Sequence, residues 1–253
     1  MNRAMLNLEN RLRQHRRAVL LFSGGLDSSL LLAVAARVLG PGLTALTFSG
    51  PHIVPGELAQ AFALARRLGV RHLIRQIDPL TLPDFRENSR QRCYVCKQAI
   101  ITRAWKIARE SRAEALWDGT NVDDLTDFRP GLIAARELGV AAPLLDAGLN
   151  KAAIRALSRS LGLDADKPAQ SCLATRFPYG TALSREALAR VGAAEAWLRR
   201  RGFNRLRLRS HGDLARLELN SDQWADFLKP EVYGLFTALI NRLGWRRLEL
   251  DER

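Results

Sequence analysis

The chain has 253 residues, is 47% apolar and carries a formal net charge of +13. This length and apolar content allow one large or two modest domains, and we expect two. Residues 1–17 contain no continuous apolar stretch and no later window is long enough to span a membrane. The sequence therefore predicts a cytoplasmic protein with no signal peptide and no membrane partner. The charge would suit a polyanion, but arginine runs such as residues 199–201 also occur on solvated helix faces, so nucleic acid is not the expected partner.

Short apolar strands alternate with amphipathic helices up to about residue 145, which is typical of a parallel sheet covered on both faces. We expect strands at residues 18–22, 43–48, 72–76 and 115–117, and helices at residues 26–38, 55–68, 97–111 and 131–138. Ligands bind at the carboxyl ends of the strands in such sheets. The residues that fall at this edge are Ser23, Ser49, Asp118 and Asn121.

The C-terminal part has a different pattern. A helix is expected at residues 150–161, and the loop at 164–181 is rich in proline, glycine and small polar residues, so we place a domain boundary there. Beyond it we expect helices at 184–200 and 230–243, two strands around residues 210–213, and a last strand through Leu248 and Leu250. The predicted architecture is α/β: residues 1–165 form a parallel sheet sandwiched by helices, and residues 166–253 form a linker loop and a small α+β domain.

The most informative motif, Ser23-Gly24-Gly25-Leu26-Asp27-Ser28, follows the first predicted strand. Two glycines permit a tight turn, and the helix that follows presents free N–H groups and a positive dipole end, so phosphate is the natural ligand. The lysine of a Walker loop is absent, since Asp27 and Ser28 occupy the end of the motif. The alternative is a serine-glycine turn that caps a helix, with Asp27 and Ser28 favouring its first turn.

The motif resembles the PP-loop of the ATP pyrophosphatases, which cleave ATP between its α and β phosphates and adenylate a substrate. The resemblance implies that the loop holds the departing phosphates and that Asp27 is an oxygen ligand of Mg²⁺. The residues it assigns to the phosphates are Ser23, Gly24, Gly25 and Ser28. Ser49 and Asp124 are expected to contact ATP or Mg²⁺ at the same edge; for Asp118 and Asp124, turn and cap chemistry is the alternative.

Three cysteines in a reducing compartment do not predict a disulfide framework. Cys93 and Cys96 form a C-x-x-C motif, and Cys172 lies in the loop between the predicted domains. Thiolates favour zinc or an iron–sulfur cluster, and a four-iron cluster held by three thiolates keeps one iron open. Zinc would need a fourth ligand, and none of the histidines has a short ligand spacing to a cysteine: His15, His52, His72 and His211. The alternative is that Cys93 and Cys96 are ordinary residues at a helix start and Cys172 is an incidental loop thiol.

Five motifs together resemble the LarE family, PP-loop sulfur transferases that build the nickel-pincer nucleotide cofactor. They are the Ser-Gly-Gly-Leu-Asp-Ser loop, Arg-Cys-x-x-Cys-Lys at 92–97, Asp-Gly-Thr-Asn-Val-Asp-Asp at 118–124, the Cys172 loop at 171–180 and Arg-Leu-Arg-Ser-His-Gly-Asp at 207–213. The likeness covers nearly the whole chain. Single motifs are modest signals, but the full set in this order is hard to obtain by accident.

The resemblance implies an enzyme that adenylates a carboxylate of pyridinium-3,5-biscarboxylic acid mononucleotide, releases pyrophosphate and forms a thiocarboxylate. Its implied cofactors are ATP, Mg²⁺ and a 4Fe-4S cluster held by Cys93, Cys96 and Cys172, and its implied catalytic residues are Cys172 and Asp27. Some members sacrifice the sulfur of the cysteine matching Cys172, whereas members with three thiols resemble cluster-binding forms that pass on a sulfide. Because this chain has all three, we favour the cluster, a sulfide donor as partner, and a homo-oligomer.

Arginines and carboxylates of the second half complete the expected site. Arg207 and Arg209 alternate along a strand, so they share one face, and the resemblance assigns them to the substrate phosphate. Arg176, four residues after Cys172, is a further expected substrate contact. The carboxylates that match family residues for a divalent ion or for oligomer contacts are Glu195, Glu218 and Asp226, with Glu195 also assigned to the substrate. The alternatives are a solvated strand face and ordinary partners of a basic surface.

Two other functions compete with this interpretation. A PP-loop enzyme that thiolates tRNA would share the adenylating chemistry, and the charge would suit an RNA backbone. Against it, the C-terminal part contains no RNA-binding module that we recognise. The other is a nucleotide-binding metal or redox sensor without catalysis, against which the retained Asp27 and Ser28 argue.

Overall fold

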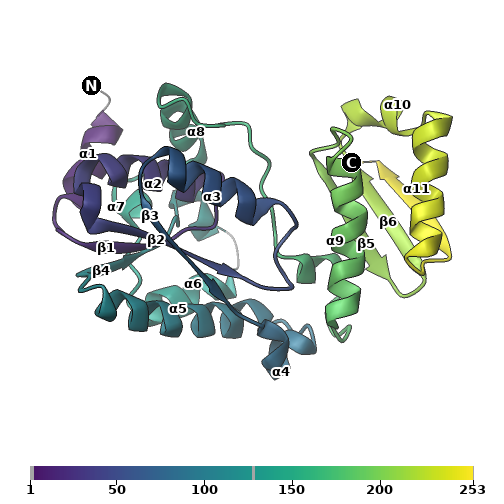
Figure 1. Ribbon diagram of the computed structural model, residues 1–253, viewed down its shortest axis with the longest axis horizontal. Helices are drawn as coiled ribbons and strands as arrows, with labels where there is room; N and C mark the ends of the chain where they lie inside the picture. The colour runs from purple at the N-terminus through teal and green to yellow at the C-terminus, as the bar shows by residue number, and fades with distance from the viewer. Residues whose placement is uncertain (1–2, 127–128, 253) are drawn as a thin grey trace.

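The computed structural model describes residues 3–126 and 129–252, so the outermost ends of the two predicted domains lie outside the described residues. Its first part is built on a four-stranded sheet of order β3-β2-β1-β4 in which every neighbouring pair is parallel (Figure 1). The strands are β1 (Ala18–Leu21), β2 (Leu43–Ser49), β3 (Arg71–Gln76) and β4 (Ala115–Trp117). The predicted α/β fold with a parallel sheet is therefore confirmed.

Both faces of β1, β2 and β4 are buried, as their apolar sequences require, whereas the edge strand β3 is partly exposed. Leu20 and Phe22 point into a core shared with the helices on one face, whereas Val19 and Leu21 point into the core on the other face. The first face is covered by α1 (Arg3–Leu12), α2 (Leu26–Leu39), α3 (Glu57–Arg67), α7 (Pro143–Asp146) and α8 (Lys151–Ser160). The second is covered by α5 (Arg92–Glu110) and α6 (Pro130–Glu137).

Helix α1 is absent from the sequence-based expectation. It buries Leu8 and Leu12, one turn apart, and Met5 packs against the same core, so this apolar face was overlooked in a segment that the sequence analysis treated as polar. The short segments were also not predicted: α4 (Pro83–Arg86), η1 (Gly40–Gly42), η2 (Pro79–Thr81), η3 (Val122–Thr126), η4 (Leu173–Arg176) and η5 (Ser221–Gln223). Among the described residues no helix is both long and apolar enough to cross a bilayer.

Helix α5 begins at Arg92, and the expected start at residue 97 is wrong. A compact turn precedes the helix: the hydroxyl of Ser89 donates to Asp84 at 2.7 Å and accepts from the backbone N–H of Gln91 at 3.0 Å. This local network fixes the start of the helix where apolar periodicity gives no signal. As a result Cys93 and Cys96 lie one turn apart on the same side of the first turns of α5.

The C-terminal part holds a second sheet of order β5-β6-β7, in which β5 and β6 are antiparallel and β6 and β7 are parallel (Figure 1). Its elements are α9 (Arg185–Arg199), β5 (Leu206–His211), β6 (Leu214–Leu219), α10 (Trp224–Phe227), α11 (Pro230–Arg242) and β7 (Arg247–Glu252). The two strands expected around residues 210–213, the last strand and both long helices are thus present. Besides η5, α10 was not expected.

One apolar core joins this second sheet to the first part of the chain. Phe85 and Cys96 belong to the same cluster as Leu173 and Phe177 of the intervening loop and the interior of the small domain. The loop after residue 166 is therefore packed against α5 along its apolar side. The exact division between residues 165 and 166 stays a prediction, because this core extends across it.

Candidate active site

The loop between β1 and α2 is held in shape from two sides. Gly24 has φ +76°, and a Cβ there would lie 3.0 Å from the Cβ of Ala61 in α3. A Cβ on Gly119, after β4, would lie 2.9 Å from the backbone nitrogen of Ser28. Close approach of neighbouring backbone therefore requires glycine at both positions. The loop is fixed where it opens α2, with the free N–H groups at the start of that helix available to an anion.

Hydroxyl groups at the loop lie side by side. Ser23 Oγ and Ser28 Oγ are 3.0 Å apart, the hydroxyl of Ser28 donates to the carbonyl of Gly25 at 3.1 Å, and the N–H of Gly25 donates to Ser23 Oγ at 3.3 Å. The predicted phosphate contacts are thus brought together in one small loop. Their assignment to ATP stays a prediction.

Two lysines that the sequence analysis missed converge on the loop. The ammonium of Lys151 pairs with the carboxylate of Asp27, and Lys167 Nζ donates to the carbonyl oxygen of Gly24 at 2.7 Å. Lys151 lies at the start of α8, whereas Lys167 lies in the loop before the small domain. Both bring a positive charge to a loop that has no Walker lysine of its own.

A third lysine, Lys97, contacts the carboxylate of Asp118 at 3.0 Å. Asp118 is buried and also accepts the backbone N–H and the hydroxyl of Thr120, at 3.1 and 2.6 Å. Burial by itself would raise the pKa of Asp118, but Lys97 and Thr120 outweigh it and lower the pKa. Lys97 ends the Arg-Cys-x-x-Cys-Lys motif, which was the signal available in the sequence.

One carboxylate oxygen of Asp27 has no hydrogen-bond partner among the described residues. Burial raises its pKa, the pairing with Lys151 opposes this shift, and the charge of Asp124 adds to it. Oδ1 of Asp27 is buried and has no hydrogen-bond partner among the described residues. Two neighbouring carboxylates, one with an unsatisfied oxygen, form a donor set that fits Mg²⁺. Residues Asp27 and Asp124 would hold this ion.

Asp124 also takes part in the turn chemistry considered as its alternative. It accepts the backbone N–H and the side-chain amide of Asn121 at 3.0 and 2.8 Å, and Arg129 approaches it at 2.5 Å. Asp124 and Asn121 are both buried. The turn therefore holds the carboxylate in place beside the loop.

An apolar cavity of about 180 Å³ opens at the carboxyl ends of β1 and β2. Ser23, Ser49 and Lys97 line it together with Phe22, Leu46, Phe48, Ile53 and Leu58. His52 also lines it, and burial lowers the pKa of this histidine to about 4. The cavity has the apolar walls and few polar groups that suit a nucleobase.

A more polar cavity of about 360 Å³ lies between the start of α3, the loop at residues 164–170 and the connection from α9 to β5. Glu57, Lys167 and Arg199 contribute to its lining, and Glu57 also lines the apolar cavity. Burial raises the pKa of Glu57, while Lys167 and Arg199 oppose the shift. Glu57 could not be singled out from the sequence, since one carboxylate in the first turn of a helix is commonplace.

The three cysteines share one neighbourhood. Cys93 is exposed, Cys172 is partly exposed and Cys96 is buried. Burial, together with negative charge on Cys172 and Cys93, raises the pKa of Cys96 to about 12. Burial also raises the pKa of Cys172 to about 11, with Cys93 adding to the shift. The fold therefore brings Cys172 into the electrostatic range of the C-x-x-C motif.

A cluster of three thiols without carboxylate or imidazole is a donor set that fits sulfur-preferring metals. The thiols are nevertheless not arranged as a finished metal site: within residues 3–126 and 129–252 no group of three or more histidine, cysteine and carboxylate side chains has the geometry to hold a metal ion. The cluster and its three ligands stay predictions.

Arg176 and Glu195 form a buried network that ties the Cys172 loop to α9. Arg176 Nε donates to Glu195 Oε1 at 2.7 Å, Arg199 donates to Oε2 at 2.8 Å, and the N–H of Leu208 donates to Oε1 at 3.0 Å. Arg176 also donates to the carbonyl oxygen of Ser171. Burial would raise the pKa of Glu195, but the two arginines and the N–H of Leu208 lower it. Both oxygens of Glu195 are thus engaged within the chain.

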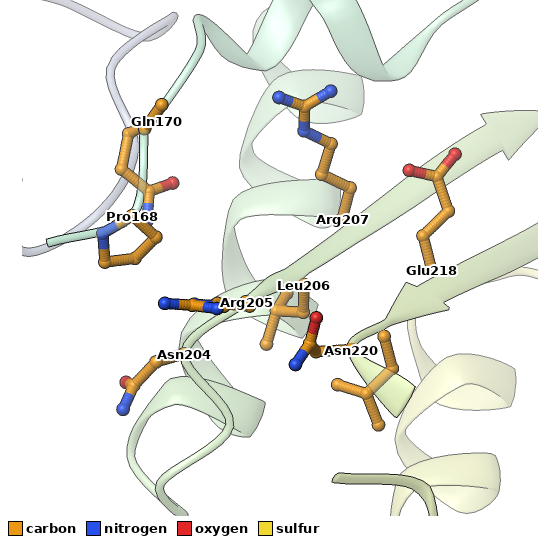
Figure 2. A pocket seen from close by; sticks show the side chains of 10 residues that line it. Pro168, Gln170, Asn204, Arg205, Leu206, Arg207, Glu218 and Asn220 are labelled. Carbon is orange, nitrogen blue, oxygen red and sulfur yellow. The ribbon is translucent and has the colours of Figure 1, made fainter. Parts of the chain in front are cut away.

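The predicted phosphate-binding arginines share one face of β5, as the alternation along the strand required. Arg209 pairs with Glu218 and donates to the carbonyl of Thr175 at 3.2 Å. Figure 2 shows Arg207 and Glu218 extending on the same side of their neighbouring strands, where both line a cavity of about 210 Å³. This cavity also receives Gln170 and Arg205 (Figure 2).

The three carboxylates expected at a divalent ion are held separately in this chain. Glu195 lies in the buried network, Glu218 pairs with Arg209, and Asp226 forms an exposed pair with Lys229 at 2.6 Å. Their proposed roles in ion binding or assembly stay predictions.

A parallel sheet whose first strand leads through a Ser-Gly-Gly-x-Asp-Ser loop into a helix defines a PP-loop nucleotide-binding protein. Consistent with this class, residues 7–116 match the asparagine synthase family model.

Relatives specify the family. A Lactiplantibacillus plantarum protein named pyridinium-3,5-bisthiocarboxylic acid mononucleotide synthase is 36% identical over 246 residues, which cover 95% of this chain and 87% of that protein. The chain belongs to this family, the LarE family, and is an ATP-dependent sulfurtransferase. Uncharacterised proteins of Synechocystis sp. and Methanocaldococcus jannaschii are 39% and 27% identical, over 93% and 86% of this chain and 88% and 84% of their own lengths.

Proposed function

We propose that this protein adenylates a carboxylate of pyridinium-3,5-biscarboxylic acid mononucleotide and converts it to a thiocarboxylate. In the first step a carboxylate oxygen of the substrate attacks the α-phosphorus of ATP, the bond to the bridging oxygen breaks, and pyrophosphate leaves. In the second step sulfur attacks the acyl carbon, the bond from that carbon to the AMP oxygen breaks, and AMP leaves. The proposal is supported by a glycine loop contacted by two lysines, together with three neighbouring thiols, in a member of this family.

The first step needs compensation for negative charge on the departing phosphates. The N–H groups at the start of α2 and the hydroxyls of Ser23 and Ser28 would donate to them, with the Ser28 hydroxyl exchanging its bond to the Gly25 carbonyl for one to phosphate. Lys151 and Lys167 add positive charge at the same loop. Asp27 and Asp124 would hold Mg²⁺, which when bound neutralises charge on the triphosphate. The apolar cavity lined by Ser49 would take the adenine.

The second step needs a sulfur nucleophile near the acyl carbon. Negative charge on Cys93 raises the pKa of Cys172, and negative charge on either of these two raises the pKa of the buried Cys96. A 4Fe-4S cluster held by these three thiolates would keep one iron open to carry a sulfide. Direct sacrifice of the Cys172 sulfur is the competing source. The proposal also includes a cytoplasmic, homo-oligomeric enzyme supplied by a sulfide donor.

The test is anaerobic incubation of reconstituted protein with ATP, Mg²⁺ and the dicarboxylate mononucleotide, followed by mass analysis of the small molecules and the protein. We expect substrate-dependent release of pyrophosphate and AMP, and a product with oxygen exchanged for sulfur. An unchanged Cys172 mass supports a carried sulfide, whereas loss of its sulfur indicates sacrifice. Asp27→Asn should lower pyrophosphate release about a hundredfold. Release stimulated by tRNA and not by the mononucleotide would overturn the proposal in favour of tRNA thiolation.

A further inference from the structure

Arg92, the first residue of α5, is a buried cation with no counter-ion among residues 3–126 and 129–252. Its side chain is 6% exposed, and Nε and Nη1 are buried with no hydrogen-bond partner among the described residues. A buried guanidinium without an acceptor is strongly unfavourable, so a structure that retains one is normally completed by an anionic ligand. Arg92 lies outside the phosphate loop, at the start of the helix that carries Cys93 and Cys96.

The guanidinium of Arg92 is held in place by the ring of Tyr179. Its central carbon lies 4.2 Å from the ring centroid of Tyr179, a cation–π contact that covers one face of the group. The loop carrying Tyr179 is fastened by Asn88, whose side-chain amide donates to the carbonyls of Phe177 and Pro178 at 3.3 and 2.7 Å. The carbonyl of Asn88 accepts the N–H of Gly180 at 3.1 Å. The ring and the arginine are therefore positioned by the fold before any ligand arrives.

Arg92 also lies next to the sulfur chemistry. It directly precedes Cys93 in α5, and Cys96 of the same helix packs in one apolar cluster with Cys172. Arg176 lies on the other side of Cys172 in the chain and donates to the carbonyl oxygen of Ser171, and both arginine charges act on Cys172. The two arginines differ in what neutralises them. Arg176 is fully paired with Glu195, whereas the contacts of Arg92 within the described chain leave its positive charge uncompensated. Arg92 is thus the cation at Cys172 whose charge is available to a ligand.

We propose that Arg92 is the receptor for a carboxylate presented beside Cys172, namely the carboxylate of the substrate that is not being adenylated. This assignment rests on the proposed function for the identity of the ligand, and it names a residue that binds and orients the substrate. A salt bridge at this position holds the pyridinium ring so that the activated acyl carbon faces the sulfur. It also restricts the site to substrates that carry a second anionic group.

The experiment uses the whole protein without ATP, so it is independent of the adenylation chemistry. Iodoacetate carries a carboxylate next to its electrophilic carbon, and iodoacetamide is its neutral counterpart. The alkylation rates of Cys172 by the two reagents are measured by peptide mass analysis at a fixed pH under reducing, metal-free conditions. Each rate is divided by that of 2-mercaptoethanol with the same reagent. Cys172 is partly exposed, which gives the reagents access.

We expect the normalised iodoacetate-to-iodoacetamide ratio at Cys172 to fall about tenfold in Arg92→Gln. Arg92→Lys, which keeps the charge, should retain most of the preference. Arg90→Gln is the matched control, because Arg90 is exposed and lies 5.7 Å from the same ring. Thermal unfolding and the Cys93 alkylation rate report whether each variant is folded.

A second arm uses pyridine-3,5-dicarboxylate as a competitor. It should protect Cys172 from iodoacetamide in the wild type and in Arg90→Gln, and fail to do so in Arg92→Gln, with nicotinamide as the neutral comparison. An unchanged reagent ratio in folded Arg92→Gln, or equal protection in both variants, would overturn the assignment of Arg92. These results do not depend on pyrophosphate release, so failure of the proposed function would be seen separately.

Discussion

Burial decides the protonation state of one histidine in this protein. His52 lies against Phe85 and accepts the N–H of Leu173 at its carbonyl, which places it between the apolar cavity and the Cys172 loop. Its ring nitrogen Nδ1 is buried without a partner among the described residues. Burial holds its pKa at about 4, so the imidazole is neutral at physiological pH.

This histidine predicts how stability depends on pH. Because its pKa is lowered in the folded state from 6.5, the unfolded chain takes up the proton first as the pH falls. The free energy of unfolding should therefore decrease by roughly 2 kcal/mol between pH 7 and pH 5 from this residue alone. His52→Gln should lack this part of the decrease in urea unfolding at the two pH values.

The comparison with the variant isolates His52, because other groups contribute equally to both proteins. Asp27 and Glu57, whose pKa values are raised by burial, act in the opposite direction and gain stability as the pH falls. Identical pH dependence in wild type and His52→Gln would show that this histidine is not buried in the neutral form.

At the scale of elements, the site depends on how closely the loops after β1 and β4 approach each other. Gly119 brings the β4 loop against the start of α2, where its missing side chain leaves room for the backbone of Ser28. The same loop carries Asp118 and leads to Asp124, so one contact positions both the phosphate loop and the carboxylates.

Gly119→Ala tests this contact. The added Cβ would lie 2.9 Å from Ser28 N and 3.2 Å from its Cα, so the β4 loop or α2 must shift. We expect a loss of about 1–3 kcal/mol in thermal or urea unfolding, with reduced pyrophosphate release. Gly234→Ala in α11, where nothing lies within 4 Å of the added Cβ, is the control and should be neutral or slightly stabilising. Equal behaviour of the two variants would refute the close-approach argument.

At the scale of the whole molecule, a buried ion network connects the thiol loop to the small domain. Glu195 accepts from Arg176 in the Cys172 loop, from Arg199 on its own helix and from the N–H of Leu208 in β5. Three parts of the chain are thus joined at one carboxylate that is inaccessible to solvent.

Removing that carboxylate charge should be costly, because Arg176 would remain buried without its counter-ion. We expect Glu195→Gln to lower the free energy of unfolding by about 3–5 kcal/mol and to increase amide hydrogen exchange in residues 171–176. Asp226→Asn removes a carboxylate from an exposed pair and should change little. A mild effect of Glu195→Gln with unchanged exchange would show that the network does not hold the loop.

Relations between neighbouring residues could be predicted from the sequence. The apolar runs gave the parallel sheet, the Ser23–Ser28 motif gave the phosphate loop, and alternation along β5 put Arg207 and Arg209 on one face. Helix α1 and the start of α5 were missed or misplaced, since sparse apolar contacts and a polar turn network determine them.

Only the tertiary structure decided which distant side chains meet. Lys151 reaches Asp27 and Lys167 reaches Gly24 across more than a hundred residues of chain, and no spacing rule connects them. The same holds for the environment of Cys172 and for the contrast between the paired Arg176 and the unpaired guanidinium nitrogens of Arg92. Periodicity and turn chemistry act over a few residues, whereas burial and charge pairing depend on the packing of the complete fold.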